Sequence, residues 1–241
     1  MDYAEGGTLW DVLESSPHDG LILESDLRWW IPQAVSAVHW CHSQGFVHRY
    51  VDPVVITHAE SITQLYSDVK PHNFVLTSDA HLLLIDFGSA APLLPPSDNG
   101  SQLLPRQHCL IPCGTCDYIS PEILQAHEQA LVALEMDDDD DNSPPLKSHE
   151  PGEYGLETDW WSLGAMIYEM AYGVAPFFAP DIRSTYLRII NHEVRFIYNI
   201  CKKLGIEYFQ KSLRFDKNVA VSHELQHFLR RLADRYNANH C

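Results

Sequence analysis

Asp68-Val69-Lys70-Pro71-His72-Asn73 is followed, 18 residues after Asp68, by Asp86-Phe87-Gly88. Two short apolar runs, 74–76 and 82–85, lie between these motifs and flank the turn-forming residues Thr77-Ser78-Asp79. Apolar runs on either side of such a turn are typical of a β-hairpin. Because a hairpin returns the chain to its starting point, the pattern predicts that Asp86 lies beside Asn73.

The side chains of these motifs suit phosphoryl transfer from a nucleotide. This reaction needs a carboxylate near the attacking hydroxyl, a cation on the moving phosphate, and oxygen ligands that hold magnesium across the phosphates. Asp68 can accept the hydroxyl proton, and Lys70 can steady the transferred phosphate. Asn73 and Asp86 can ligate Mg²⁺. Each motif alone is a weak signal, but their combination at this spacing is specific.

The 241 residues are strongly acidic, with 33 Asp and Glu against 16 Lys and Arg and a net charge of -17. This charge disfavours bare nucleic acid and anionic membranes as partners. No apolar run reaches the roughly 18 residues that a membrane-spanning helix needs, and residues 1–5 lack the features of a signal peptide. Six cysteines without a repeating framework fit a reduced compartment. The composition therefore predicts a soluble, cytoplasmic protein.

Apolar residues at three- and four-residue steps predict a mostly helical chain with a little sheet. One helix begins at Asp26, a candidate N-cap, and ends at Gly45. The dense apolar signal of residues 160–172 predicts a buried helix, and the apolar residues of 228–232 mark a last amphipathic helix.

Two polar stretches are predicted to be loops. Residues 92–105 are rich in Pro and Ser, which favour turns. Residues 125–153 contain the five consecutive aspartates 137–141, and like charges that repel one another stay solvated. We therefore expect 125–153 to be a disordered acidic loop.

Further motifs make the chain resemble a known family. They are Met1-Asp-Tyr-Ala-Glu-Gly-Gly7, Gly114-Thr-Cys-Asp-Tyr-Ile-Ser-Pro-Glu-Ile-Leu124, Asp159-Trp-Trp-Ser-Leu-Gly164 and Pro176-Phe-Phe178. Together with the first two motifs, they resemble the C-terminal lobe of a eukaryotic Ser/Thr protein kinase of the AGC group. The most similar branch contains myotonic-dystrophy kinase, Rho-associated kinase and citron kinase.

The resemblance implies one α+β, protein-kinase-like domain over residues 1–241: a mainly helical C-terminal lobe with a small β-hairpin region. These residues include no Gly-rich phosphate loop and no strand lysine in a Val-Ala-x-Lys context. We therefore expect the N-terminal lobe to be absent from this chain.

The resemblance also implies roles for individual residues. Asp68 and Lys70 would be catalytic, and Mg²⁺ would be held by Asn73 and Asp86. Asp159 would hold the backbone of the catalytic loop, and Glu169 would bind a basic residue of the protein substrate. The residues implied in ATP binding are Asp2, Ala4, Asn73, Val75 and Asp86. The residues implied in structural or regulatory roles are His48, Arg49, Phe87, Gly88, Thr115, Glu122 and Asp159.

The contiguous His-Arg-Asp of the family is split in this chain, where His48-Arg49 is separated from Asp68 by residues 50–67. The codons of 50–67 and of a second segment, 194–210, permit splice donors and acceptors in frame at their ends. We interpret both segments as retained introns, with true insertions as the alternative.

The family pattern also changes at three single positions. Thr8 and His72 stand where acidic residues usually bind arginine of the substrate, which implies a weaker preference for basic substrates. Ile111 occupies a common activating phosphorylation position, so phosphorylation there is impossible.

Two functional hypotheses follow from these observations. The first is a Ser/Thr protein kinase catalytic domain, incomplete in this chain, that transfers the ATP γ-phosphate to Ser or Thr hydroxyls of protein substrates. The second is a catalytically inactive kinase-like lobe that binds partner proteins. The joint presence of Asp68, Lys70, Asn73 and Asp86 favours the enzyme.

Overall fold

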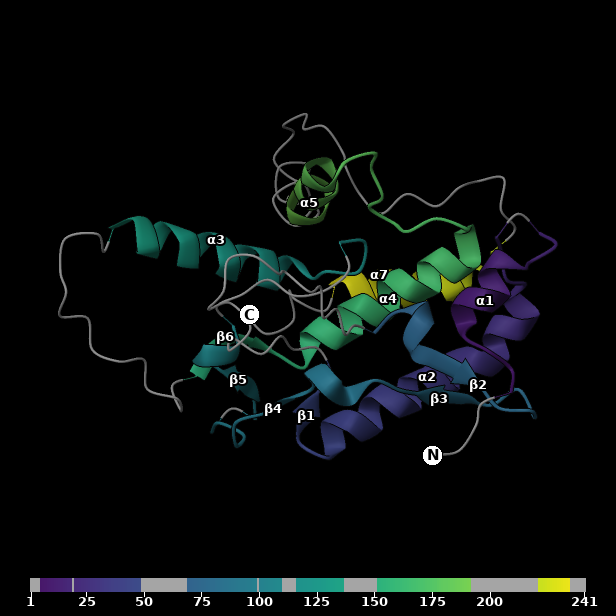
Figure 1. Cartoon of the computed structure of the whole chain (residues 1–241), viewed down its shortest axis with the longest axis horizontal. Coiled ribbons are helices and arrows are strands. Elements are labelled where there is room, and N and C mark those ends of the chain that lie inside the picture. The colour runs from purple at the N-terminus through teal and green to yellow at the C-terminus, as the bar shows by residue number, and fades with distance from the viewer. Residues whose placement is uncertain are drawn as a thin grey trace.

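A computed structural model of the chain describes residues 5–18, 20–48, 69–98, 100–109, 116–136, 151–191 and 221–234. It combines helices with small antiparallel sheets, as Figure 1 shows. The helices are α1 (Leu9–Glu14), α2 (Glu24–Ser43), α3 (Pro121–Met136), α4 (Glu157–Tyr172), α5 (Ile182–Ile190) and α7 (His223–Asp234). The strands are β1 (Phe46–Val47), β2 (Phe74–Leu76), β3 (Leu82–Leu84), β4 (Ala91–Pro92), β5 (Leu103–Pro105) and β6 (Pro151–Gly155). Among the described residues, no helix is both long and apolar enough to cross a membrane.

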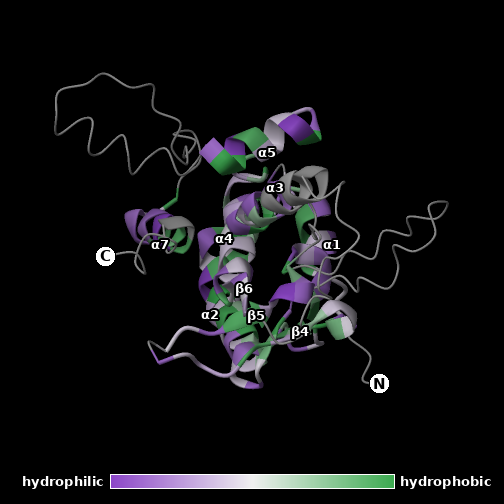
Figure 2. Ribbon diagram, turned by 90° about the vertical axis from the view of Figure 1, so that its left-hand side faces the viewer, coloured by the Kyte–Doolittle hydropathy of each residue, from purple (hydrophilic) through white to green (hydrophobic). Residues whose placement is uncertain are grey.

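Helix α4 lies at the centre of the fold, so the predicted buried helix at 160–172 is confirmed. Because its apolar residues occur on nearly all sides, it is covered by other elements rather than by water. Helices α2 and α7 pack against it, and in Figure 2 α3 and α5 lie on the side away from α7. Gly164 permits the close approach of α7, since a Cβ at this position would lie 2.9 Å from the Cβ of Leu232.

Helix α2 begins three residues earlier than the sequence predicts, with Leu23 rather than Asp26 at the N-cap. Leu23 has the extended N-cap backbone but makes no side-chain cap, and Asp26 lies within the first turn. The prediction that Asp26 is the N-cap is therefore wrong, although its charge still faces the positive end of the helix dipole. The predicted end is correct, because Gly45 follows the C-cap with a φ of +82°.

The predicted β-hairpin is confirmed by the antiparallel pairing of β2 with β3, in which Phe74 faces Leu84 and Leu76 faces Leu82. Helix α2 supports the turn of this hairpin. The indole N–H groups of Trp29 and Trp30 both donate to the carbonyl oxygen of Ala80, at 3.2 and 3.1 Å. These contacts hold the hairpin against α2, and so they help to position the start of β2 and the end of β3.

The two predicted loops contain regular structure. Residues 92–105 begin in β4, which pairs with β1, and end in β5, which pairs with β6. The disordered loop predicted at 125–153 is wrong at both ends: α3 continues to Met136, and β6 begins at Pro151. The reason is local, because residues 125–136 are rich in Ala, Leu, Gln and Glu, which are strong helix formers. Residues 137–150, with the aspartate run, lie outside the described part.

Two glycines of β6 permit its close approach to β5. A Cβ on Gly155 would lie 2.1 Å from the carbonyl oxygen of Gln102, just before β5, and one on Gly152 would lie 2.9 Å from the carbonyl oxygen of Leu104 in β5. Glycine is the residue that allows such contact, because any larger residue would place an atom there. The pairing of β5 with β6 therefore depends on both positions.

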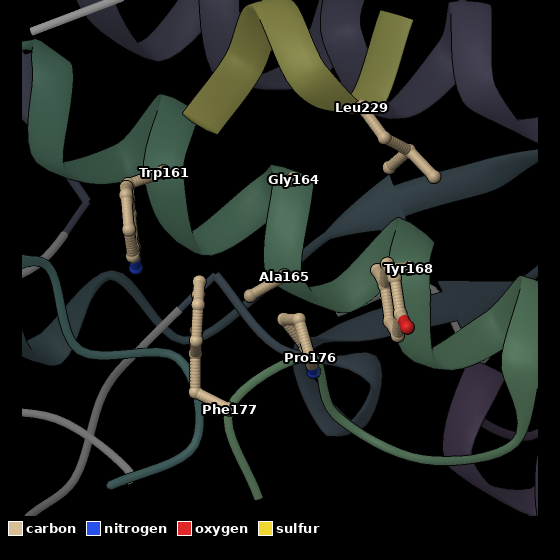
Figure 3. Close-up of a pocket in the computed structure, with 7 residues that line it drawn as sticks. All are labelled: Trp161, Gly164, Ala165, Tyr168, Pro176, Phe177 and Leu229. Carbon is tan, nitrogen blue, oxygen red and sulfur yellow. The ribbon is translucent and has the colours of Figure 1, made fainter. Parts of the chain in front are cut away.

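A small apolar cavity lies between α4, α7 and the segment that follows α4 (Figure 3). Trp161 and Phe177 form one wall as parallel rings with centroids 5.5 Å apart. The cavity is lined by Trp161, Gly164, Ala165, Tyr168, Pro176, Phe177 and Leu229. None of these is a predicted site residue, so we assign the cavity to the helix packing.

Candidate active site

The β2–β3 hairpin brings Asp86 back to Asn73, as the sequence predicts. The 3-10 helix η2 (Pro71–Asn73) leads into β2, and the Asn73 N–H donates to the Lys70 carbonyl oxygen at 3.0 Å. Where β3 ends, the Ile85 N–H donates to the Asn73 carbonyl oxygen at 2.9 Å. Asp86 therefore directly follows a residue that is hydrogen-bonded to Asn73. The Asn73 side chain is buried, whereas that of Asp86 is exposed.

Asp86 adopts the left-handed backbone conformation, with φ 62° and ψ 66°. Aspartate tolerates this region better than most residues, but it remains an unfavourable conformation that the surrounding structure must stabilise. The conformation turns the chain from β3 into the short 3-10 helix η3 (Phe87–Ser89). Gly88 lies in this helix, and a Cβ there would approach the Oδ1 of Asp86 to 3.3 Å. Glycine at position 88 therefore leaves room for the carboxylate of Asp86.

His48 joins the residues before and after Asp86. Its ring Nε2 lies 2.9 Å from the carbonyl oxygen of Ile85, and its ring packs edge-on against Phe87 with centroids 4.9 Å apart. His48 is fully buried. The imidazole therefore fixes the chain on both sides of Asp86.

A single carboxylate oxygen of Asp159 accepts two hydrogen bonds. The backbone N–H of His48 donates at 2.8 Å, and the Nε2 of His42 lies at the same distance. Both Asp159 and His42 are buried, and the two are 117 residues apart in the sequence. The contact ties α2 and the chain after β1 to α4. The sequence gives no sign of the His42 contact, because His42 simply follows the apolar positions of its helix.

An open apolar cavity of about 410 Å³ lies next to the Asp86 turn, lined by Trp40, Cys41, Gln44, Phe46, Phe87 and Ala90. The rings of Trp40, Phe46 and Phe87 remain exposed to solvent. Cys41 is buried at its base, and burial, followed by the nearby charge of Asp159, raises the pKa of its thiol to about 12. This thiol is therefore protonated at neutral pH.

Glu169 lies on α4, where its carboxylate accepts a hydrogen bond from the hydroxyl of Tyr118. Burial raises the pKa of Glu169, the Tyr118 hydrogen bond opposes this rise, and the charge of Asp117 adds to it. Burial also raises the pKa of Asp117. Two carboxylates thus lie close together in a partly dry environment, which favours a cation beside them.

Of the remaining predicted site residues, some are described by the structure and others lie outside the described part. Val75 lies in β2 and forms an isolated antiparallel bridge with Thr8, and Glu122 is buried at the start of α3. Lys70 is half-buried just before η2. The predicted residues that lie outside the described part are Asp2, Ala4, Arg49, Asp68 and Thr115.

Comparison with known proteins shows what the candidate active site is similar to. Residues 54–137 match the model of the protein kinase domain. This range contains Asp68, Lys70, Asn73 and Asp86. The candidate active-site residues therefore lie in the part of the chain that is similar to the protein kinase domain.

The curated relatives are Ser/Thr protein kinases. The chain is 36% identical over 196 residues to serine/threonine-protein kinase MRCK beta of Homo sapiens, and the match covers 81% of this chain and 9% of that protein. It is 34% identical over 196 residues to MRCK alpha of Homo sapiens, covering 81% of this chain and 8% of the relative. The chain is 34% identical over 193 residues to MRCK gamma of Mus musculus, and the match covers 80% of this chain and 9% of that protein. The chain is thus similar to these Ser/Thr protein kinases over about four fifths of its own length, and it spans less than a tenth of theirs.

Proposed function

We propose that this chain contributes the catalytic loop and Mg²⁺ ligands of a Ser/Thr protein kinase. The observation that carries the proposal is the hydrogen-bonded approach of Asn73 to the residue before Asp86, within the segment that matches the kinase domain. In the reaction, Asp68 accepts the proton of a Ser or Thr hydroxyl of the substrate, while the oxygen of that hydroxyl bonds to the γ-phosphorus of ATP. The bond from that phosphorus to the bridging oxygen breaks, and ADP leaves.

The residues beside the hairpin fit Mg²⁺. An amide oxygen from Asn73 and a carboxylate from Asp86 are hard oxygen donors, and Mg²⁺ typically binds one or two such side chains together with substrate phosphates. When bound, the ion would neutralise charge on the phosphates. Lys70 adds a positive charge next to Asn73, and His48 and Phe87 hold the Asp86 turn in position.

The remaining assignments rest on the same resemblance. The described helices and small sheets support assignment to the C-terminal lobe of the kinase fold. Asp2, Ala4 and Val75 would contact the nucleotide, and Glu169 a basic residue of the protein substrate. The six cysteines without a repeating framework support an intracellular, cytoplasmic setting.

Phosphate transfer from radiolabelled ATP to a Ser-containing protein tests this proposal, using the intact gene product. We expect Asp68→Asn and Asp86→Asn to lower kcat at least a hundredfold, since each removes a group that acts on the reacting atoms. Asp79→Asn is the matched control, because Asp79 is exposed at the far turn of the same hairpin. Undiminished transfer by Asp68→Asn would refute the assignment of the base.

The alternative is an inactive lobe that binds partner proteins, which the half-exposed apolar rings next to Asp86 favour. It predicts no transfer by the wild-type protein and no effect of Asp86→Asn on partner binding. We expect residues 1–241 alone to show no measurable turnover, because they include no Gly-rich loop or strand lysine to stabilise the phosphates.

A further inference from the structure

Helix α7 carries two histidines that are one helical turn apart. The helix begins with the sequence His-Glu-Leu-Gln-His at residues 223–227, and both His223 and His227 are exposed. Side chains four residues apart lie on the same face of a helix, with Cβ atoms about 5–6 Å apart. The two imidazoles are therefore neighbours on the solvent-facing side of α7.

The opposite face of α7 packs against the core. Leu225 and Leu229 are buried, and Leu229 lines the cavity between α7 and α4 that Figure 3 shows. Since an α-helix has 3.6 residues per turn, these leucines lie on the side away from both histidines. The packed face therefore holds α7 in place and leaves the imidazoles accessible to a ligand.

The start of α7 is also fixed, so His223 lies in a well-formed first turn. The Ser222 hydroxyl accepts a hydrogen bond from the Leu225 N–H at 3.1 Å, which is an N-cap contact. The Ser222 N–H donates to the Oε2 of Glu24 on α2 at 2.7 Å. Because the cap and the packed face define the helix, the spacing of His223 and His227 is set before any ligand binds.

Two imidazoles at this spacing can chelate a transition metal. The neutral imidazole is the commonest metal ligand in proteins, and it suits Zn²⁺, Cu²⁺ and Ni²⁺. In metalloproteases, the sequence His-Glu-x-x-His on a helix presents two such rings to one zinc ion. We propose that His223 and His227 bind one Zn²⁺ ion through their ring nitrogens. This inference is independent of the proposed kinase function.

The ligands indicate an open binding site rather than a protease centre. Catalytic zinc sites take three protein ligands, and the described residues contain no group of three or more His, Cys, Asp or Glu that could hold a metal ion. Water therefore completes the coordination of the ion. Glu224, exposed next to His223, offsets the positive end of the helix dipole near the cation. The ion links the first and second turns of α7.

Histidine modification by diethyl pyrocarbonate, followed at each residue by mass spectrometry, tests the site in the intact protein. We expect ZnCl₂ to protect His223 and His227 along one common curve. Protection should be about tenfold at ten times the apparent Kd, because the free fraction of the site falls as 1 + [Zn²⁺]/Kd rises. His18 is the internal control, since it is exposed and has no histidine within four residues. MgCl₂ should protect neither histidine of the pair, because Mg²⁺ prefers oxygen ligands.

Two variants test whether the pair acts as one chelating site. His227→Ala should weaken the protection of His223 by Zn²⁺ at least about tenfold, since loss of even a supporting group costs a metal site about that much. The double variant His227→Ala/Arg231→His restores the number of histidines, but it separates them by eight residues, about 12 Å along the helix. It should bind Zn²⁺ as weakly as His227→Ala, although it also removes a positive charge. All these positions are exposed, and thermal melts without zinc check that the variants remain folded.

Several results would overturn the proposal. They are no protection of His223 and His227 by Zn²⁺, protection of one without the other, and equal protection of His18 or by MgCl₂. Undiminished protection of His223 in His227→Ala would show that the two rings do not share an ion. Wild-type affinity in the double variant would show that the one-turn spacing is irrelevant, and would equally overturn the chelating pair.

Discussion

Replacing Gly155 with alanine should separate β6 from β5. The added Cβ would lie 2.1 Å from the carbonyl oxygen of Gln102 and 3.2 Å from the Cα of Leu103, which are both backbone atoms. Carbon–oxygen contacts between strands are normally about 3.3–3.6 Å. One strand must therefore retreat by more than about 1 Å. Because the obstructing atoms are backbone, no side-chain rotation can relieve the clash, and the pairing of Leu103 with Gly155 is lost.

The expected loss of stability combines three contributions. Overpacking costs about 1–3 kcal/mol, and each backbone hydrogen bond lost from the ladder costs about 1 kcal/mol. The reduced freedom of the unfolded chain on replacing glycine returns about 0.4–1 kcal/mol. With one hydrogen bond lost, the net decrease in the free energy of unfolding is about 1–4 kcal/mol, which corresponds to roughly 2–16 °C in Tm for a chain of this size.

Gly20→Ala provides the control for backbone conformation alone. Gly20 has a φ of +79°, and its added Cβ would meet nothing within 4 Å. Its expected cost is about 1 kcal/mol from the left-handed backbone. Urea midpoints give both values, and hydrogen exchange reports on the amides of β5. A Gly155→Ala loss no larger than that of Gly20→Ala, with unchanged protection in β5, would refute the reasoning.

Asp159→Ala should lower the free energy of unfolding by about 3–5 kcal/mol, because it leaves the two donors that converge on Asp159 buried without an acceptor. A loss below about 1 kcal/mol, measured by urea unfolding, would contradict this. Wild-type stability should fall as pH rises from 4.5 through the raised folded-state pKa of Glu169, because the unfolded chain ionises this group more easily. Glu169→Gln should therefore gain stability over the wild type with rising pH, and a pH-independent difference between their denaturation curves would count against it. Cys41 should react with iodoacetamide at pH 8 roughly a thousandfold more slowly in the native than in the unfolded chain, since its pKa rises from 9.0 to about 12; comparable labelling of Cys41 by mass spectrometry in both states would disprove this. Spliced transcripts should lack codons 50–67, and their retention in most messages would argue for a true insertion.

Local patterns predicted the elements on which the candidate site is built. The β2–β3 hairpin follows from two short apolar runs around a turn, and the approach of Asp86 to Asn73 follows from that hairpin. Helix α4 follows from its dense apolar sequence, because burial on most sides leaves few positions for polar residues. Such features are readable because residues close in sequence determine them.

Contacts between distant residues were not predictable in the same way. The pairing of β5 with β6 depends on two glycines whose function is visible only beside the opposite strand. The hydrogen bond from His42 to Asp159 joins residues on two different helices, and neither residue carries a local sign of its partner. The aspartate run at 137–141 led to the expectation of disorder throughout 125–153, although the residues just before it favour a helix.

The anchoring of His48 has a consequence for the evolution of the gene. His48 is fully buried and tied to α4 through its backbone, and Val69, on the far side of the segment 50–67, is also fully buried. The core thus holds the chain on both sides of that segment. Lengthening a connection between two fixed points adds to its closure entropy only logarithmically. A change of exon boundary between these two anchors can therefore alter the coding sequence with little thermodynamic penalty for the folded core. Selection on such a change would act through the position of Asp68, and so through reaction rate, before it acted through stability.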